Sequence, residues 1–128
     1  MSTFPADLRY THDHEWLRAH GANWRVGITQ FAVDQLGDIT LVDLPNIGDL
    51  ITKGQRFGTI ESVKSVSDLY APVSGKVVAV NASLKDSPEQ VNATPYDGGW
   101  MIEIEAPDKS EVDELMAADA YGKHVAAQ

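Results

Sequence analysis

The chain has 128 residues, a length that fits one domain with its own hydrophobic core. Its 19 acidic and 10 basic side chains give a formal charge of −9, which disfavours nucleic acid and anionic membranes as partners. The absence of cysteine excludes a disulfide framework, a protein thiol nucleophile and a zinc–cysteine site. No run of residues approaches the ~20 apolar residues of a membrane span, and the first residues lack a secretory signal, so we expect a cytoplasmic protein.

The N-terminal half predicts short strands joined by turns, with a hairpin between the second and the third. These strands are expected at residues 8–11, 14–18, 24–28 and 39–44. Between the last two, Thr29 and Gly37 are typical of a helix start and a helix stop. The buried side of this short helix is expected to carry Phe31, Ala32 and Leu36.

The C-terminal half continues this pattern and ends in a helix. Further strands are expected at residues 56–63, 65–71, 76–80 and 100–105. Residues 81–97 contain prolines and asparagines typical of a loop. Asp108 and Glu111 have the spacing of a capping box, so a helix is expected to start there and to be broken or kinked at Gly122. Its apolar side is expected to comprise Val112, Leu115 and Met116.

Closely spaced short strands with peripheral helices predict a mainly β fold, a small antiparallel barrel or sandwich. The sequence has no βαβ rhythm, no glycine-rich phosphate loop and no linker that would divide the chain. We therefore expect residues 1–128 to form a single domain.

Lys64 is expected at the tip of the hairpin formed by residues 56–71. Two registers are open. A turn centred on Lys64 and Ser65 would place Glu61 opposite Asp68, a like-charge pair that costs stability. A turn centred on Val63 and Lys64 would instead place Ser62 opposite Ser65 and Phe57 opposite Tyr70. In both registers Lys64 is exposed, which suits either a covalent attachment point or an ordinary solvated hairpin tip.

Two histidines offer a competing hypothesis. His12 and His14 would share one face of a strand and could bind a metal together with Glu15 or His20. A metal-dependent enzyme of this kind would be indifferent to Lys64.

The pattern as a whole resembles the H proteins of the glycine cleavage system over nearly the whole chain. The matching residues are Tyr10-Thr11, His14-Glu15-Trp16, Val26-Gly27-Ile28-Thr29, Leu36-Gly37-Asp38-Ile39, Val42-Asp43-Leu44-Pro45, Glu61-Ser62-Val63-Lys64, Ser67-Asp68, Pro72-Val73-Ser74-Gly75, Asn92, Pro95-Tyr96 and Gly99-Trp100. Ser65 departs from the family, which more usually has alanine there.

The resemblance implies a flattened barrel-sandwich hybrid of the lipoyl-domain type, with short peripheral helices and a C-terminal helix. Residues 23–105 would form the lipoyl-binding core, and residues 107–128 a C-terminal helical segment. Lipoate would be joined to Lys64 by an amide bond. The protein would be a carrier and not an enzyme.

The same resemblance implies the partners. The aminomethyl group of glycine would come from a pyridoxal-phosphate glycine decarboxylase (P protein) and pass to a tetrahydrofolate-dependent aminomethyltransferase (T protein). Dihydrolipoamide dehydrogenase (L protein) would reoxidise the carrier, and a lipoate ligase or an octanoyltransferase would modify it. A carrier that visits several enzymes in turn is expected to be a monomer. An alternative with the same Lys64 is a lipoyl donor to 2-oxoacid dehydrogenase complexes.

Glu15 and Asp68 are the candidates for holding the loaded amine against the barrel, by charge-assisted hydrogen bonds. The alternative is that Asp68 is an ordinary turn residue and Glu15 an ordinary surface charge.

Overall fold

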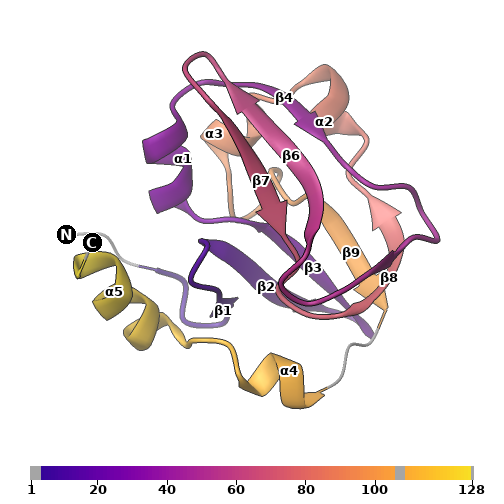
Figure 1. The fold of residues 1–128 in the computed structure, drawn as a ribbon, viewed down its shortest axis with the longest axis vertical. Coiled ribbons are helices and arrows are strands. Elements are labelled where there is room, and N and C mark those ends of the chain that lie inside the picture. Colours follow the sequence, from indigo (N-terminus) through magenta and orange to yellow (C-terminus); the bar gives the residue numbers. More distant parts are fainter. Residues whose placement is uncertain (1–3, 106–108, 128) are drawn as a thin grey trace.

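Two antiparallel sheets face each other in the computed structural model, which describes residues 4–105 and 109–127 (Figure 1). The six-stranded sheet has the order β1-β2-β3-β9-β8-β5, and the three-stranded sheet has the order β4-β6-β7. The strands of the first are β1 (Arg9–Tyr10), β2 (Glu15–His20), β3 (Asn23–Ile28), β9 (Ile102–Glu105), β8 (Gly75–Val80) and β5 (Leu50–Ile51). Those of the second are β4 (Ile39–Asp43), β6 (Arg56–Ser62) and β7 (Val66–Tyr70). The predicted mainly β architecture is confirmed.

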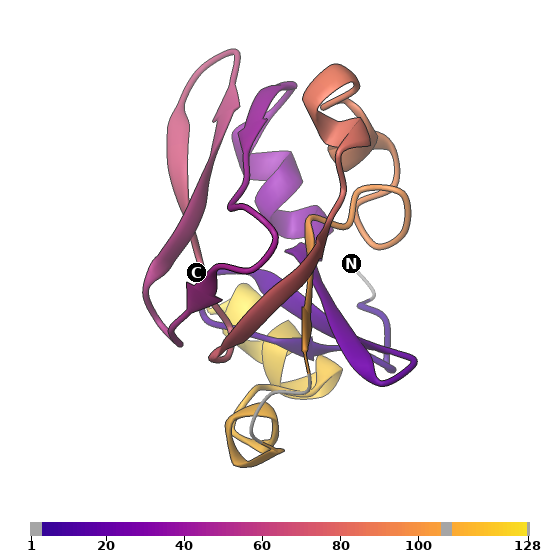
Figure 2. The ribbon, with the colours of Figure 1, turned by 90° about the vertical axis from the view of Figure 1, so that its right-hand side faces the viewer.

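The main core fills the space between the two sheets, which Figure 2 shows as separate layers. Alternation along each strand decides which side chains enter it. On β9, Ile102 and Ile104 are fully buried while Glu103 between them is only half-buried. On the opposing hairpin, Ile60 and Leu69 are almost fully buried. The burial of each such aliphatic side chain contributes about 1.5–3 kcal/mol to the stability of the folded state.

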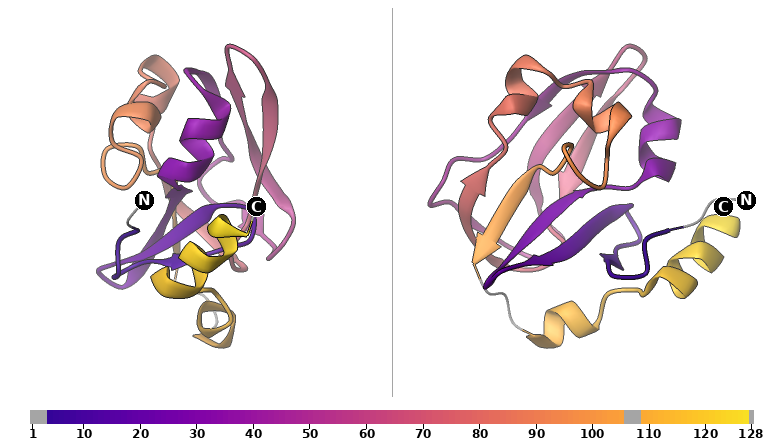
Figure 3. Two further views of the ribbon diagram at one scale, coloured as in Figure 1. Left: turned by 90° about the vertical axis from the view of Figure 1, so that its left-hand side faces the viewer. Right: turned by 180° about the vertical axis from the view of Figure 1, so that it is seen from behind.

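A second, aromatic core lies between α5 (Ala118–Ala126) and the strands β1 and β2 (Figure 3). The rings of Tyr10 and Tyr121 are stacked, with centroids 4.5 Å apart and planes 7° apart. Trp16 is fully buried, and its indole N–H donates to the carbonyl oxygens of Ile28 and Pro95, each at 3.0 Å. The aromatic core fixes the C-terminal helix to the start of the chain.

Helix α1 (Gln30–Leu36) has the predicted caps. The Thr29 hydroxyl accepts from the Ala32 N–H, and Gly37 ends the helix with a φ of +82° that favours glycine. The prediction of its buried side is confirmed in part. The three predicted side chains are half-buried: Ala32 and Leu36 pack on the main core, and Phe31 packs on the aromatic core. The buried residue of the helix is Val33, which was not predicted.

The segment 81–97, predicted as a loop, contains two short helices. They are α2 (Ser83–Asp86) and α3 (Gln90–Ala93). Each buries one aliphatic side chain completely, Leu84 in α2 and Val91 in α3. Burial in the tertiary structure therefore stabilises turns that the local sequence alone does not specify.

The single C-terminal helix predicted from residue 108 is also wrong. The chain forms α4 (Lys109–Asp113) and then α5, and Gly122 lies inside α5 without breaking it. Between the helices, Met116 exchanges two backbone hydrogen bonds with Tyr10, at 2.8 and 2.9 Å, which a continuous helix could not do. The predicted cap at Asp108 lies outside the described residues, and the Glu111 carboxylate accepts from the Ser74 N–H at 2.7 Å.

Strand β9 begins at Ile102, two residues later than predicted.

Within the part of the chain that the structure describes, no helix is long and apolar enough to cross a membrane.

Two glycines give opposite predictions for the same substitution. Gly27 pairs with Trp16 across the hairpin β2–β3, and a Cβ there would lie 2.5 Å from the indole ring. Gly27→Ala should therefore lower the free energy of unfolding by about 1–3 kcal/mol. Gly122→Ala, inside α5 with its nearest neighbour at 4.0 Å, should raise it by about 0.5–1 kcal/mol. Chemical denaturation measures both, and equal effects would contradict this account of the aromatic core.

Candidate functional site

The hairpin β6–β7 turns at Val63 and Lys64, the second of the two registers left open by the sequence. Glu61 pairs with Val66, and the Ser62 N–H donates to the Ser65 carbonyl at 2.8 Å. This register avoids the like-charge pair, because Asp68 lies opposite Thr59 and not opposite Glu61.

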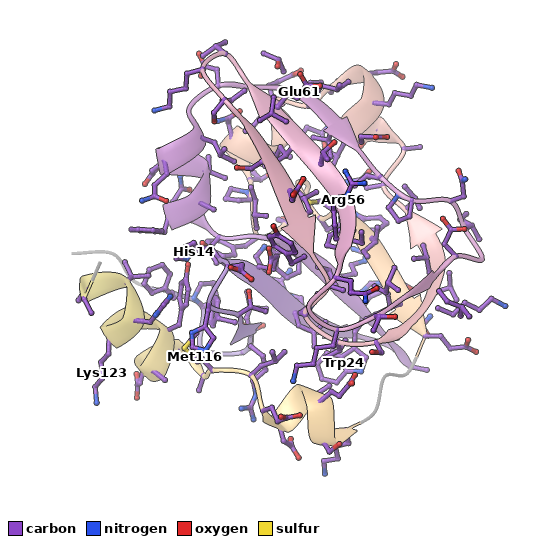
Figure 4. All side chains as sticks on the ribbon, viewed as in Figure 1. His14, Trp24, Arg56, Glu61, Met116 and Lys123 are labelled. Atoms are coloured by element: carbon purple, nitrogen blue, oxygen red, sulfur yellow. The ribbon has the colours of Figure 1, made fainter. Side chains whose placement is uncertain are left out.

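The expected pairing of Phe57 with Tyr70 does not form. A bulge between Arg56 and Gly58 shifts the register, so that Tyr70 pairs with Arg56. Phe57 is buried instead. Figure 4 labels Arg56 and Glu61 at the two ends of β6.

The backbone of the tip is held by hydrogen bonds while the Lys64 side chain stays exposed. The Ser62 hydroxyl accepts from the N–H groups of Lys64 at 3.3 Å and Ser65 at 3.1 Å. The Val63 N–H donates to the Asp38 carbonyl at 3.0 Å, which joins the tip to the turn between α1 and β4. Within the described residues, the Lys64 ammonium has no ion pair and no hydrogen bond. The Lys64 amine is therefore exposed on a tip whose backbone is held in place.

A groove of about 260 Å³ begins beside this tip. It runs between the hairpin, α1 and the turn that precedes β2. The lining residues are Asp13, His14, Glu15, Ile28, Ala32, Gln35, Leu36, Ile60, Ser65, Ser67, Asp68 and Leu69. Ile28, Ile60 and Leu69 make part of the wall apolar, and Asp13, Glu15 and Asp68 contribute carboxyl groups to it. The groove therefore suits a flexible apolar chain that ends in a polar or cationic group.

Glu15 is the buried carboxyl of this groove, with only 2% of its surface exposed. Its Oε1 accepts from the Thr11 hydroxyl at 2.6 Å, and its Oε2 accepts from the Tyr70 N–H at 3.3 Å. Burial raises the pKa of Glu15 to about 8, although both hydrogen bonds oppose that shift. The carboxyl is therefore mainly protonated at neutral pH, and a cation beside it would favour the carboxylate. The alternative of an ordinary surface charge is wrong for Glu15.

Asp68 lines the same groove from β7 and is exposed. The Tyr70 hydroxyl donates to it at 3.4 Å, and Arg56 lies 4.0 Å away. The structure thus brings Glu15 and Asp68, which are far apart in sequence, into one groove with Ser65 of the hairpin tip.

The histidine metal site does not form. Residues 12–14 belong to a turn, with His14 at a φ of +71°, so His12 and His14 do not share the face of a strand. His14 Nδ1 lies 2.8 Å from the Tyr121 hydroxyl, and His14 is placed between α1 and α5 (Figure 4). His20 lies at the far end of β2, next to Glu103. No group of three potential ligands in the described ranges could hold a metal ion.

Three contributors to the site were missed from the sequence: Thr11, which hydrogen bonds Glu15, and Ser62 and Asp38, which hold the tip. The hydroxyl of Ser62 two residues before Lys64 is a local signal that could have been used. The contact of Asp38 with Val63 has no such local signal.

Comparison with known proteins gives a consistent result. The model of the family described as glycine cleavage H-protein matches residues 8–128. The glycine cleavage system H protein of Anoxybacillus flavithermus is 56% identical over 119 residues, which cover 93% of this chain and 94% of the relative. That of Halalkalibacterium halodurans is 51% identical over 128 residues and covers 100% of both chains. The crystal structure of the H protein of Mycobacterium marinum, 41% identical, superposes with a TM-score of 0.87 and covers 96% of this chain and 99% of that one.

The raised pKa of Glu15 predicts a pH-dependent stability. Because the folded protein releases this proton near pH 8 and the unfolded chain near pH 4.5, the folded state binds more protons between these values. Its free energy of unfolding should therefore fall as pH rises through this window, by up to ~1.4 kcal/mol per pH unit from this group. Below pH 4.5 and above pH 8, Glu15 should add no slope.

Glu15→Gln should remove this part of the slope, so that the variant gains stability relative to the wild type between pH 5 and pH 8. Urea denaturation at several pH values measures the difference. Glu105→Gln, an exposed position at the end of β9, controls for the loss of one negative charge. A constant difference between Glu15→Gln and the wild type across the window would contradict the prediction.

Proposed function

The chain belongs to the glycine cleavage H-protein family, and we propose that Lys64 is the residue through which it carries the family's lipoyl group. The H protein is a lipoyl carrier of the glycine cleavage system and not itself an enzyme. The observation that carries the assignment to Lys64 is its exposed amine, which has no partner among the described residues, at a hydrogen-bonded hairpin tip. Acylation of this amine would remove one positive charge and change the formal charge from −9 to −10.

The groove beside Lys64 fits such a group. Ile28, Ile60 and Leu69 offer apolar contacts to a hydrocarbon chain, and the groove starts at Ser65, next to the attachment point. When bound, a lipoyl group supplies a redox-active disulfide and a sulfur atom that can carry a one-carbon amine. The protein supplies position and environment, as is usual for proteins that carry a cofactor.

We propose that Glu15 and Asp68 hold the amine of the loaded carrier. Both residues line the groove, where Asp68 offers an exposed carboxylate and Glu15 a buried carboxyl. An ammonium group beside Glu15 would lower the pKa of that carboxyl and draw it toward the carboxylate form. The resulting charge-assisted hydrogen bond would be strong because the surroundings are largely desolvated.

The partners follow from the same assignment. A member of the glycine cleavage system functions together with glycine decarboxylase, aminomethyltransferase and dihydrolipoamide dehydrogenase. We propose that the carrier passes the aminomethyl group of glycine from the first to the second and is reoxidised by the third. The charge of −9 favours basic docking surfaces on these enzymes. A monomeric state and a cytoplasmic location stay predictions, as does the division into a core of residues 23–105 and a C-terminal segment of residues 107–128.

The modifying enzyme, a lipoate ligase or an octanoyltransferase, must reach the Lys64 amine itself. The exposure of Val63 and Val66, at 70% and 65%, leaves the tip open to it. A role as lipoyl donor to other complexes would use the same residue. Glycine–bicarbonate exchange with the decarboxylase separates the two roles, because only a carrier in glycine cleavage must be accepted by that enzyme.

Lipoylation of Lys64 gives a direct prediction. Incubation of the protein with a lipoate ligase, ATP and lipoate should add one lipoyl increment to the intact mass. Lys64→Arg should abolish the increment, because a guanidinium is not acylated. Lys76→Arg, an exposed lysine on β8, is the matched control and should keep it. An increment that survives in Lys64→Arg would place the lipoyl group elsewhere.

The role of the two carboxyl groups gives another prediction. In protein loaded with the aminomethyl group, Glu15→Gln and Asp68→Asn should each speed the spontaneous loss of that group, by about tenfold, because a charge-assisted hydrogen bond is lost. Release of ammonia over time measures this rate. Asp43→Asn, an exposed carboxylate outside the groove, is the control. Unchanged lifetimes in both groove variants would remove Glu15 and Asp68 from this role.

A further inference from the structure

The side-chain amide of Asn92 clamps the segment that carries the hairpin tip. Asn92 lies in α3, and its Nδ2 donates to the Gly37 carbonyl at 2.9 Å. Its Oδ1 accepts from the Ile39 N–H, also at 2.9 Å. One half-buried side chain thus binds both ends of the three-residue segment 37–39. The role proposed for Lys64 gives Asn92 no part, although Asn92 is one of the residues by which the chain resembles its family.

The backbone of this short segment connects Asn92 to the hairpin tip. Asn92 binds the residues at its two ends, Gly37 and Ile39. The carbonyl of Asp38, which lies between them, accepts from the Val63 N–H at 3.0 Å. The segment therefore lies between the Asn92 amide and the residue that precedes Lys64.

The Lys64 side chain meets the same segment. A Cβ placed on Gly37 would lie 3.5 Å from the Lys64 Cε, which is ordinary van der Waals contact. A shift of residues 37–39 would thus move the hydrogen-bond acceptor of the tip backbone and a surface beside the lysine stem together. The Ser62 hydroxyl holds the turn from within the hairpin, whereas this clamp fixes where the hairpin lies on the body of the protein.

We infer that Asn92 is a positioning residue for Lys64. It acts through segment 37–39 and the hydrogen bond that the Val63 N–H donates to the Asp38 carbonyl. The inference rests on the proposed function of Lys64 as the lipoyl-bearing residue. Asn92 does not touch the reacting amine. It holds the tip in the position that a modifying enzyme must recognise, so that fewer conformations compete with the reactive one.

The test combines a local and a functional measurement on Asn92→Ala. Hydrogen exchange of the Val63 amide, followed by NMR in the unmodified protein, should become about tenfold faster, while exchange at the buried Ile60 on the same strand reports global unfolding. The kcat/KM of a lipoate ligase for Lys64, followed by intact mass, should fall about fivefold, the effect expected when the hydrogen bond from the Val63 N–H to the Asp38 carbonyl no longer holds the tip.

Asn81→Ala is the matched control. The Asn81 amide also ties a loop together, donating to the carbonyls of Gly98 at 2.9 Å and Trp100 at 2.7 Å, and it makes no hydrogen bond to segment 37–39 or to the hairpin. It should leave Val63 exchange and lipoylation near their wild-type values. Should Asn92→Ala not fold, Asn92→Asp keeps the acceptor for Ile39 and lacks the donor for Gly37, and faster Val63 exchange is expected there too.

Wild-type Val63 exchange in the folded Asn92 variants, or equal effects in Asn81→Ala, would overturn the inference. Faster Val63 exchange with an unchanged kcat/KM for lipoylation would also overturn it, because the clamp would then not act on Lys64. If the wild-type protein itself accepts no lipoyl group on Lys64, the proposed function fails. That failure is distinguishable, because the exchange measurement needs no lipoylation.

Discussion

The hairpin tip combines an exposed lysine with a backbone that is held in place by the rest of the fold. An isolated two-stranded hairpin is at best marginally stable in water, so the strands β6 and β7 alone would not hold Lys64 still. Their inward side chains Ile60 and Leu69 anchor the hairpin in the main core, and β4 adds a third strand along one edge. The bond from Val63 to Asp38 extends this support to the tip itself. The exposed Lys64 side chain is therefore carried on a backbone that buried neighbours and hydrogen bonds hold in place.

Unlike the tip, which exposes its lysine, the groove beside it buries a carboxyl group, and this burial lowers the stability of the fold. Glu15 lies where the turn before β2 approaches β7, and its two hydrogen bonds compensate only part of its desolvation, as its raised pKa shows. A glutamine of the same shape would avoid this cost. Local violations of good packing chemistry of this kind are expected at functional sites, where stability is exchanged for a group poised to change its charge.

The sequence predicted the features that short-range patterns encode. The strands other than β5 and the β2–β3 hairpin followed from alternation and turn residues, and the two caps of α1 followed from Thr29 and Gly37. It narrowed the tip to two registers, and the structure has the one that places Glu61 opposite Val66 and away from Asp68. The failures depend on distant contacts: the helices α2 and α3 exist because Leu84 and Val91 are buried. The metal hypothesis failed because residues 12–14 turn and do not continue β2. In the site, Glu15 and Asp68 were chosen by resemblance, because local sequence patterns do not show that β2 and β7 bring the two residues into one groove.

The elements outside the two main sheets are needed because they shape that groove. The Tyr121 hydroxyl of α5 lies 2.7 Å from the Thr29 hydroxyl, the N-cap of α1, and 2.8 Å from His14 Nδ1. Burial raises the pKa of Tyr121, so the phenol keeps its proton and this network at neutral pH. Since α1 and His14 each contribute to a wall of the groove, the contacts of α5 with Thr29 and His14 help to fix their separation. The stack of Tyr121 on Tyr10 then ties α5 to the strand next to β2, which begins with Glu15. The aromatic core is thus a support for the site, whereas the main core supports the tip.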